Sequence, residues 1–200
     1  MMRMFLALMA ASLLTAGGGM AQEKADNVPP PGFVALFNGK DMTGWLERGK
    51  PPVHWTAKDG VLVYDGKGGD LFGVDKFSNY VLHFDWKVEK NGNSGVYLRG
   101  GNPQVEINDA DPPANKIWNG TSGGLYPDKP PLKRAAKPTG EWNHFEVSVD
   151  KGVITMHTNG ELTIDAFKKD WGKTASGAIG FQNHGTPVWY KNIYIKKRDE

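Results

Sequence analysis

Residues 80–89 read Tyr-Val-Leu-His-Phe-Asp-Trp-Lys-Val-Glu and form the clearest strand pattern in the chain. Large apolar side chains occupy every second position from Tyr80 onward, and polar side chains such as His83 and Asp85 fall between them. Side chains along an extended strand point alternately to its two faces. The pattern therefore predicts a strand with one face in a hydrophobic core and the other directed outward or into a cleft.

Short segments of the same kind flank this strand, and turn residues such as the Asn-Gly pairs at 38–39 and 159–160 separate them. Short strands with turn signals about every eight to twelve residues are typical of a β-sandwich or barrel. Only residues 165–171 suit a short helical turn. We therefore predict an all-β fold, a jelly-roll β-sandwich of two antiparallel sheets. The other expected strands span residues 34–37, 54–57, 60–64, 142–150, 153–158, 161–166, 178–182 and 188–196.

Residues 93–111 contain two further short strands, joined by a Gly-Gly-Asn-Pro turn at 100–103. Strand alternation places Tyr97 and Arg99 on one face of the first strand. It places Gln104, Glu106 and Asn108 on one face of the second strand. A buried polar group without a partner costs about 1–3 kcal/mol, so this face is either wet or built to hold something polar. We interpret it as the floor of a binding site.

The chain divides into three parts. Residues 1–21 are predicted to be a signal peptide, because Arg3 precedes an apolar run and small residues precede Gln22. The run at 4–16 is shorter than the roughly 20 residues that cross a membrane. Residues 22–32 are expected to be a proline-rich tether and residues 33–197 a single jelly-roll domain. The protein is expected to be periplasmic or secreted, with no integral membrane segment after signal removal.

The amino-acid composition limits the classes of partner and of chemistry that suit this protein. The chain has 24 basic and 22 acidic residues, and removal of Arg3 with the signal leaves 23 against 22, a net charge of +1. This balance does not suggest a nucleic-acid partner. The chain has no cysteine, which excludes disulfides and a thiolate nucleophile. Seven tryptophans and six tyrosines suit stacking on sugars, but the same rings also fill sheet cores.

Glu106 and His184 are the leading candidates for proton transfer. A nearby Arg99 would favour the ionised form of Glu106, whereas burial would favour its neutral form. A strand ion pair is the alternative role for this carboxylate. His184 lies beside Gly185 in an inter-strand loop, and its ordinary pKa near 6.5 suits proton transfer at neutral pH. A histidine on a surface turn is the alternative.

The segment 109–138 is long, poor in strand signal and rich in Pro, Gly and Lys, so we interpret it as a wall or lid over the site. It carries Trp118 and Tyr126. At its start, Asp109 and Asp111, together with Asn108, offer hard oxygen ligands for calcium, but the Asp-x-Asp-x-Asp-Gly spacing is missing. A capped loop start is the alternative. Asp85 could complete the site or be solvated on its strand.

Several ordered motifs resemble those of the 3-keto-disaccharide hydrolase family, also described as 3-keto-glucoside 1,2-lyase / 3-keto-2-hydroxy-glucal hydratase domains. The resemblance covers about residues 33–196 and implies a concanavalin A-like jelly roll with its site on the concave sheet. The motifs are Phe-Asn-Gly-Lys-Asp-Met-Thr-Gly-Trp (37–45), Asp-Gly-Val-Leu (59–62), Asn-Ser-Gly-Val-Tyr-Leu-Arg (93–99), Glu-Trp-Asn (141–143), Asn-Gly (159–160), Gly-Phe-Gln-Asn-His-Gly (180–185) and Lys-Asn-Ile-Tyr-Ile (191–195).

The resemblance implies an enzyme that cleaves 3-keto-glycosides and 3-keto-disaccharides by elimination and hydration. His184 and Glu106 would supply the base and the acid, in either order. Arg99, or a bound divalent metal ion, would stabilise the enolate. Four side chains would position the small-molecule sugar substrate: Gln104, Asp109, Trp118 and Tyr126.

One motif departs from the family pattern, which often has Glu-Val-Gln where this chain has Gln104, Val105 and Glu106. The exchange keeps both polar side chains on one face and moves the carboxylate by roughly 6–7 Å along the strand. Two other functions stay open. An ordinary glycoside hydrolase would use Glu106 with a second carboxylate, for which Asp85 is the partner suggested by strand parity. A non-catalytic carbohydrate-binding module would use the aromatic side chains instead.

Overall fold

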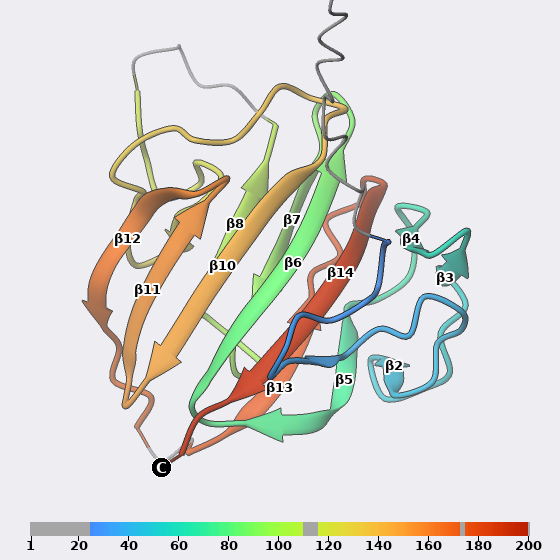
Figure 1. Cartoon of the computed structure of the whole chain (residues 1–200). Coiled ribbons are helices and arrows are strands. Elements are labelled where there is room, and N and C mark those ends of the chain that lie inside the picture. The colour runs from blue at the N-terminus through green and yellow to red at the C-terminus, as the bar shows by residue number, and fades with distance from the viewer. Residues whose placement is uncertain (1–24, 110–115, 173–174, 200) are drawn as a thin grey trace, which may run out of the picture.

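The computed structural model describes residues 25–109, 116–172 and 175–199, which form two antiparallel sheets packed face to face (Figure 1). The all-β sandwich expected from the strand pattern is confirmed. The eight-stranded sheet has the order β12-β11-β10-β6-β14-β4-β3, with β1 paired to β14. Its strands are β12 (Glu161–Lys168), β11 (Val153–Thr158), β10 (Asn143–Asp150), β6 (Tyr80–Val88), β14 (Val188–Lys197), β4 (Val61–Tyr64), β3 (Trp55–Lys58) and β1 (Val34–Ala35).

The six-stranded sheet lies behind β6, β10 and β14 in Figure 1 and has the order β2-β5-β13-β7-β8-β9. Its strands are β2 (Trp45–Glu47), β5 (Leu71–Phe77), β13 (Gly177–Phe181), β7 (Asn93–Tyr97), β8 (Gln104–Asn108) and β9 (Leu125–Tyr126). The strand pair expected within residues 93–111 is therefore β7 and β8, and it belongs to this second sheet.

The core lies between the sheets, and strand β6 shows how alternation builds it. Its apolar residues from Tyr80 to Val88 are buried, whereas His83 and Asp85 are only partly buried on the outer face. Contacts between aromatic rings join the two layers. Phe181 of β13 lies 4.3 Å, centroid to centroid, from Tyr190 of β14. Burying such rings stabilises the sandwich without any disulfide.

The helical turn predicted at 165–171 is wrong, because strand β12 continues to Lys168. Three observed strands were not expected from the sequence. The unexpected strands are β2, β5 and β9. Gly73 interrupts the alternation of β5, and the pairing of β5 with β13 shifts register between Ala178 and Gly180. Such an irregularity hides a strand from a search for strict alternation.

The described part of the proline-rich segment, residues 25–32, lies against the eight-stranded sheet. Asp26 forms an ion pair with Lys191 at 2.8 Å, and the Asn27 amide N–H donates to Asn192 Oδ1 at 2.7 Å. The signal peptide expected at residues 1–21 lies outside the described residues. No helix long and apolar enough to cross a membrane occurs in the part of the chain that the structure describes.

Candidate functional site

Strand register brings a row of residues together on the outer face of the six-stranded sheet. Phe72 of β5 lies opposite Gly180 of β13, which lies opposite Tyr97 of β7. Tyr97 in turn lies opposite Gln104 of β8, which lies opposite Tyr126 of β9. Directly opposed residues share a face. The polar face expected on β8 is therefore part of a surface that includes three aromatic side chains.

A second row runs beside the first. Glu106 lies opposite Gly95, and the Gly95 carbonyl accepts the backbone N–H of Gln182 at 2.8 Å. The two glycines leave space for their neighbours. A Cβ at Gly95 would stand 2.6 Å from Gln104 Cδ, and a Cβ at Gly180 would stand 2.4 Å from the Phe72 ring. The side chains of Gln104 and Phe72 therefore lie over the glycines and form the floor of the site.

Gln104 connects the polar groups on this floor. Its Nε2 donates to Glu106 Oε2 and to Gln182 Oε1, each at 3.1 Å. Its Oε1 is buried and has no hydrogen-bond partner among the described residues. A buried acceptor without a partner is costly, so a ligand hydroxyl that donates to this oxygen would satisfy it.

Glu106 is the carboxylate at the centre of this face. It points away from the core, because Val105 and Ile107 on either side of it belong to the core, yet only 4% of it is exposed. Burial raises the pKa of Glu106 from 4.5 to about 7, and hydrogen bonds from Gln104 and Asn108 act in the opposite direction. Burial thus outweighs the groups that favour the charged form. A carboxyl group with this pKa can both accept and release a proton near neutrality.

Arg99 was expected to lie near Glu106 as a cation. Its guanidinium Nη2 donates to the Ser78 carbonyl at 2.6 Å, and its guanidinium carbon lies 4.6 Å from the centroid of the Trp171 ring. Burial lowers the pKa of Arg99. These contacts hold the side chain toward Ser78 and Trp171, so its role at the site stays a prediction.

His184 is exposed in the loop that follows β13, two residues beyond Gln182. The loop is anchored by Asn183, whose N–H donates to Asp70 Oδ1 at 2.8 Å and whose Nδ2 donates to the Gly68 carbonyl at 2.7 Å. The backbone beside His184 is thus fixed at the rim of the second row. The residue itself is exposed, and its catalytic role stays a prediction.

An ion pair at the same rim was missed by sequence reasoning. Arg48 Nη2 lies 3.0 Å from Asp70 Oδ2, and Asp70 is largely buried. Burial and the charge of Asp70 raise the pKa of Tyr97, while a hydrogen bond with Gln182 and the charge of Arg48 lower it. Asp70 also accepts the N–H of Asn183, the residue after Gln182, which places this ion pair beside the floor. Gln182 could have been predicted as a site residue from the motif at 180–185 that contains it, whereas no sequence motif pointed to Arg48.

The segment expected to form a wall or lid contributes to the sheet edge. The Gly123 N–H donates to the Glu106 carbonyl, and the Glu106 N–H donates to the Gly124 carbonyl, each at 3.0 Å. Tyr126 lies opposite Gln104, and both Tyr126 and Trp118 are 41% exposed. Residues 110–115 lie outside the described residues. The described part of this segment fixes the backbone of Glu106 and leaves the ring of Tyr126 partly exposed on the same face.

Asp109 serves as an anchor for a loop. Its carboxylate accepts the Asn91 N–H at 2.8 Å and the hydroxyl of Thr139. This arrangement matches the capped loop start that was the alternative to a calcium ligand. Asp111, which was grouped with it, lies outside the described residues.

Asp85 does not join Glu106. It lies on the outer face of the eight-stranded sheet, where Asp85 Oδ1 is 2.6 Å from His144 Nδ1 and Asp85 Oδ2 accepts Asn192 Nδ2 at 2.6 Å. Glu106 lies on the outer face of the other sheet. Alternation correctly gave the face of each strand, but it could not say which sheet each strand enters. The two carboxylates are therefore on opposite sides of the sandwich.

The fold recurs in proteins of known structure. The structure superposes on a crystal structure of a Parabacteroides distasonis protein named as a candidate glycosyl hydrolase, with 28% identity and a TM-score of 0.77 over 88% of this chain and all of the other. An endo-beta-1,3(4)-glucanase from family GH16 shares the fold at 13% identity and a TM-score of 0.56, over 87% of this chain and 95% of the other. The concanavalin A-like jelly roll is thereby confirmed.

Sequence comparison identifies the family. A curated relative, the 3-keto-disaccharide hydrolase of Bacteroides thetaiotaomicron, is 31% identical over 233 aligned residues, which cover 86% of this chain and 80% of the relative. The family model of the 3-keto-alpha-glucoside-1,2-lyase-like domain matches residues 32–196. This chain therefore belongs to the 3-keto-alpha-glucoside-1,2-lyase-like family, as the motifs quoted from its sequence had indicated.

Proposed function

We propose that this protein is a carbohydrate-cleaving hydrolase that acts on 3-keto-glycosides, including 3-keto-disaccharides, at the outer face of the six-stranded sheet. The observation that carries the proposal is the pairing of two groups on β8. Glu106 is buried with a pKa of about 7, and the adjacent Gln104 presents an acceptor oxygen without a partner among the described residues. One group can exchange protons and the other can bind a sugar hydroxyl. Family membership supports the choice of substrate.

The chemistry of a 3-keto sugar suits a group like Glu106. The ketone at C3 acidifies the hydrogen on C2, so a carboxylate can remove that proton and leave an enolate. The enolate expels the oxygen substituent at C1 as that oxygen is protonated, which yields a 3-keto-2-hydroxy-glucal. Addition of water across the double bond places hydroxyl on C1 and a proton on C2. The net change is hydrolysis of the glycosidic bond.

We assign Glu106 to the proton on C2, because a carboxyl group with a pKa near the working pH can both take this proton and return it during hydration. His184 is the proposed acid for the leaving oxygen, since its loop is anchored at the rim beside Asp70. Arg99 is proposed to stabilise the enolate, for which its side chain would have to exchange its contact with the Ser78 carbonyl for the sugar.

Aromatic side chains on the same face would hold the sugar ring. Phe72 and Tyr97 are stacked with their ring centroids 5.7 Å apart, and Tyr126 is partly exposed on the other side of Gln104. Apolar faces of sugars pack on such rings. The polar amides of Gln104 and Gln182 would bind hydroxyls and fix the orientation of the ring. Trp118 is proposed to extend this aromatic surface.

We also propose that the protein is exported and is periplasmic or secreted.

The geometry favours keto-sugar chemistry over that of an ordinary glycoside hydrolase. A glycoside hydrolase requires two carboxyl groups about 5–5.5 Å apart for retention or about 6.5–9.5 Å apart for inversion. Asp85, the partner suggested by strand parity, lies on the opposite face of the sandwich from Glu106. A single proton-exchanging carboxyl group suffices for elimination and hydration next to a ketone.

Incubation with a 3-keto-disaccharide, followed by measurement of the free sugar released, tests this function. Wild type should release sugar and Glu106→Gln should not, while neither should cleave the same disaccharide without the keto group. Each assay is run with and without added divalent metal ions. Sugar binding without turnover under either condition would show a carbohydrate-binding module, and turnover of the unmodified disaccharide would show an ordinary glycosidase.

A further inference from the structure

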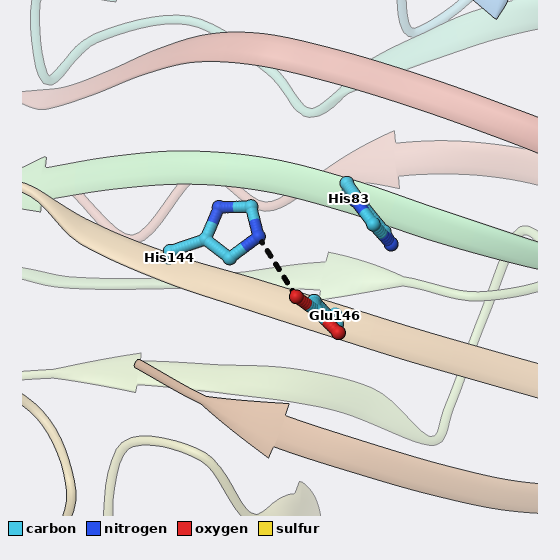
Figure 2. A group of neighbouring side chains, drawn as sticks. All are labelled: His83, His144 and Glu146. Carbon is cyan, nitrogen blue, oxygen red and sulfur yellow. Dashed lines mark ion pairs between the residues drawn. The ribbon is translucent and has the colours of Figure 1, made fainter. Parts of the chain in front are cut away.

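Two histidines and a glutamate gather on the outer face of the eight-stranded sheet, on the side of the sandwich opposite Glu106. They are His83 of β6 and His144 and Glu146 of β10, and one ligand atom from each lies within 4.8 Å of those of the other two. Figure 2 shows the three side chains on two adjacent strands, with the ion pair between His144 and Glu146 dashed. We propose that His83, His144 and Glu146 form a binding site for a divalent transition-metal ion such as Zn²⁺.

Strand register produces this grouping. His83 lies directly opposite Glu146, and His144 precedes Glu146 by two residues on the same strand, so all three share one face. His144 Nε2 and Glu146 Oε1 are 3.6 Å apart. Two ligands of a tetrahedral zinc ion, each about 2.0–2.1 Å from the metal, are separated by about 3.3 Å. Small side-chain rotations would therefore bring the three donors to the metal.

Neighbouring residues orient both imidazoles. Asp85 Oδ1 lies 2.6 Å from His144 Nδ1, which leaves His144 Nε2 on the side of Glu146. A carboxylate bonded to the far nitrogen of a histidine is the usual outer-shell partner of a metal ligand, since it fixes the ring and raises its basicity. The Phe33 ring packs against His83 with 4.5 Å between ring centroids. Asp85, which does not belong to the Glu106 site, would therefore orient the metal ligand His144.

The donors select the class of metal. Imidazole nitrogens with a carboxylate oxygen suit zinc, nickel or copper, whereas calcium and magnesium prefer sites made of oxygen ligands. The ligands are accessible, since the side chains of His144 and Glu146 are 38% and 45% exposed. His83 and His144 also line a cavity of about 400 Å³, together with Ala25, Pro30, Asp85, Asn192 and Tyr194. Three protein ligands leave at least one coordination position for water or a small ligand in that cavity.

Calorimetric titration of the untagged protein with Zn²⁺ tests the site. Wild type should bind one ion, and His83→Ala, His144→Ala and Glu146→Gln should each weaken binding by at least about 10-fold. Asp85→Asn should weaken binding by about 10- to 100-fold while the stoichiometry stays at one. His54→Ala is the matched control, because His54 Nδ1 also lies 3.1 Å from a carboxylate, that of Asp65, but is outside the cluster. It should bind Zn²⁺ as tightly as wild type.

A second measurement uses only wild type, so it does not depend on the folding of variants. Imidazole NMR signals of His83 and His144 should shift on addition of Zn²⁺, and those of His54 should not, while excess Mg²⁺ or Ca²⁺ should not displace the ion. Absence of Zn²⁺ binding by wild type would overturn the proposal, as would unchanged binding in folded His83→Ala and His144→Ala variants. Glu106→Gln should bind Zn²⁺ normally, which separates this site from the proposed catalytic face.

Discussion

Gln104 Nε2 donates a hydrogen bond to Glu106 Oε2 at 3.1 Å, although the two side chains are two residues apart on one strand. The contact requires both side chains to lean along β8, and Gly95 on the neighbouring strand leaves the space for Gln104 to do so. The same amide donates to Gln182 on β13. Burial raises the pKa of Glu106 to about 7 even though the hydrogen bond from Gln104 acts in the opposite direction.

Replacement of this carboxyl group should separate catalysis from binding. Glu106→Gln keeps the shape of the side chain but cannot exchange a proton, so kcat on a 3-keto-disaccharide should fall by about 10²- to 10⁴-fold. The affinity for the sugar should change little. Steady-state kinetics and calorimetry with the substrate measure the two effects. Glu89→Gln, at an exposed position after β6, is the control and should behave as wild type. Unchanged kcat in Glu106→Gln would remove Glu106 from the mechanism.

The pH dependence of the reaction should follow the same group. If Glu106 accepts the C2 proton, it must be ionised in the free enzyme, and burial has raised its pKa to about 7. The value of kcat/KM should therefore rise with pH as Glu106 ionises around pH 7. Initial rates measured between pH 5 and 9 check this. A rate that is flat from pH 5 to 9 would contradict the assignment of Glu106 as the base.

Stability should change with pH in the opposite direction. Because the folded-state pKa of Glu106 is raised above the ordinary value of 4.5, the folded protein binds more protons than the unfolded chain between pH 4.5 and about 7. The contribution of Glu106 to stability is then fully present below pH 4.5 and is lost as pH rises through about 7. The loss is about 3 kcal/mol.

Urea unfolding of wild type and Glu106→Gln at pH 5 and pH 8 measures this contribution. The free energy of unfolding of wild type relative to the variant should be lower at pH 8 than at pH 5. The comparison cancels the titration of all other groups that the two proteins share. An identical difference at both pH values would mean that Glu106 titrates as an ordinary exposed carboxyl group.

Replacement of Gly95 tests whether the position of Gln104 on the floor of the site matters for substrate binding. In Gly95→Ala the new Cβ would stand 2.6 Å from Gln104 Cδ, so Gln104 must move away from Glu106 and Gln182. We expect KM for the keto-sugar to rise by up to about 10-fold, because a displaced Gln104 would lose a hydrogen bond to the sugar that is worth about 0.5–1.5 kcal/mol. Gly101→Ala is the matched control, since a Cβ there meets nothing within 4 Å. Equal kinetics for the two variants would show that Gln104 does not need its observed position.

Sequence reasoning found this face because strand parity is a local property. The alternation of β8 placed Gln104 and Glu106 together, and the alternation of β6 placed Asp85 away from the core. Other features depend on contacts between distant segments. Gln182 reaches Gln104 across 78 residues of chain, and Arg99 contacts the Ser78 carbonyl and the Trp171 ring. Strand alternation gives the face of a side chain but not the sheet that its strand joins. Asp85 was therefore suggested as a partner of Glu106, although β6 and β8 belong to different sheets.

The order of the two polar residues on β8 is the departure from the family pattern, and exchanging them tests its consequence. In the double variant Gln104→Glu with Glu106→Gln, the backbone position that carries the carboxyl group shifts by roughly 6–7 Å along the strand. It would then lie between Tyr97 and Tyr126 and no longer opposite Gly95. A displacement of that size takes the base out of reach of the C2 proton, because proton transfer requires a heavy-atom distance of about 2.6–3.2 Å.

We therefore expect kcat/KM of the double variant to fall at least about 100-fold for any 3-keto-glycoside that wild type cleaves. A panel of 3-keto-disaccharides with different linkages should be tested with both proteins. The variant keeps the composition and charge of the face, so circular dichroism and the thermal midpoint should match wild type at pH 8. Full activity of the double variant on the same substrates would show that the position of the carboxyl group on β8 does not set the register of the sugar.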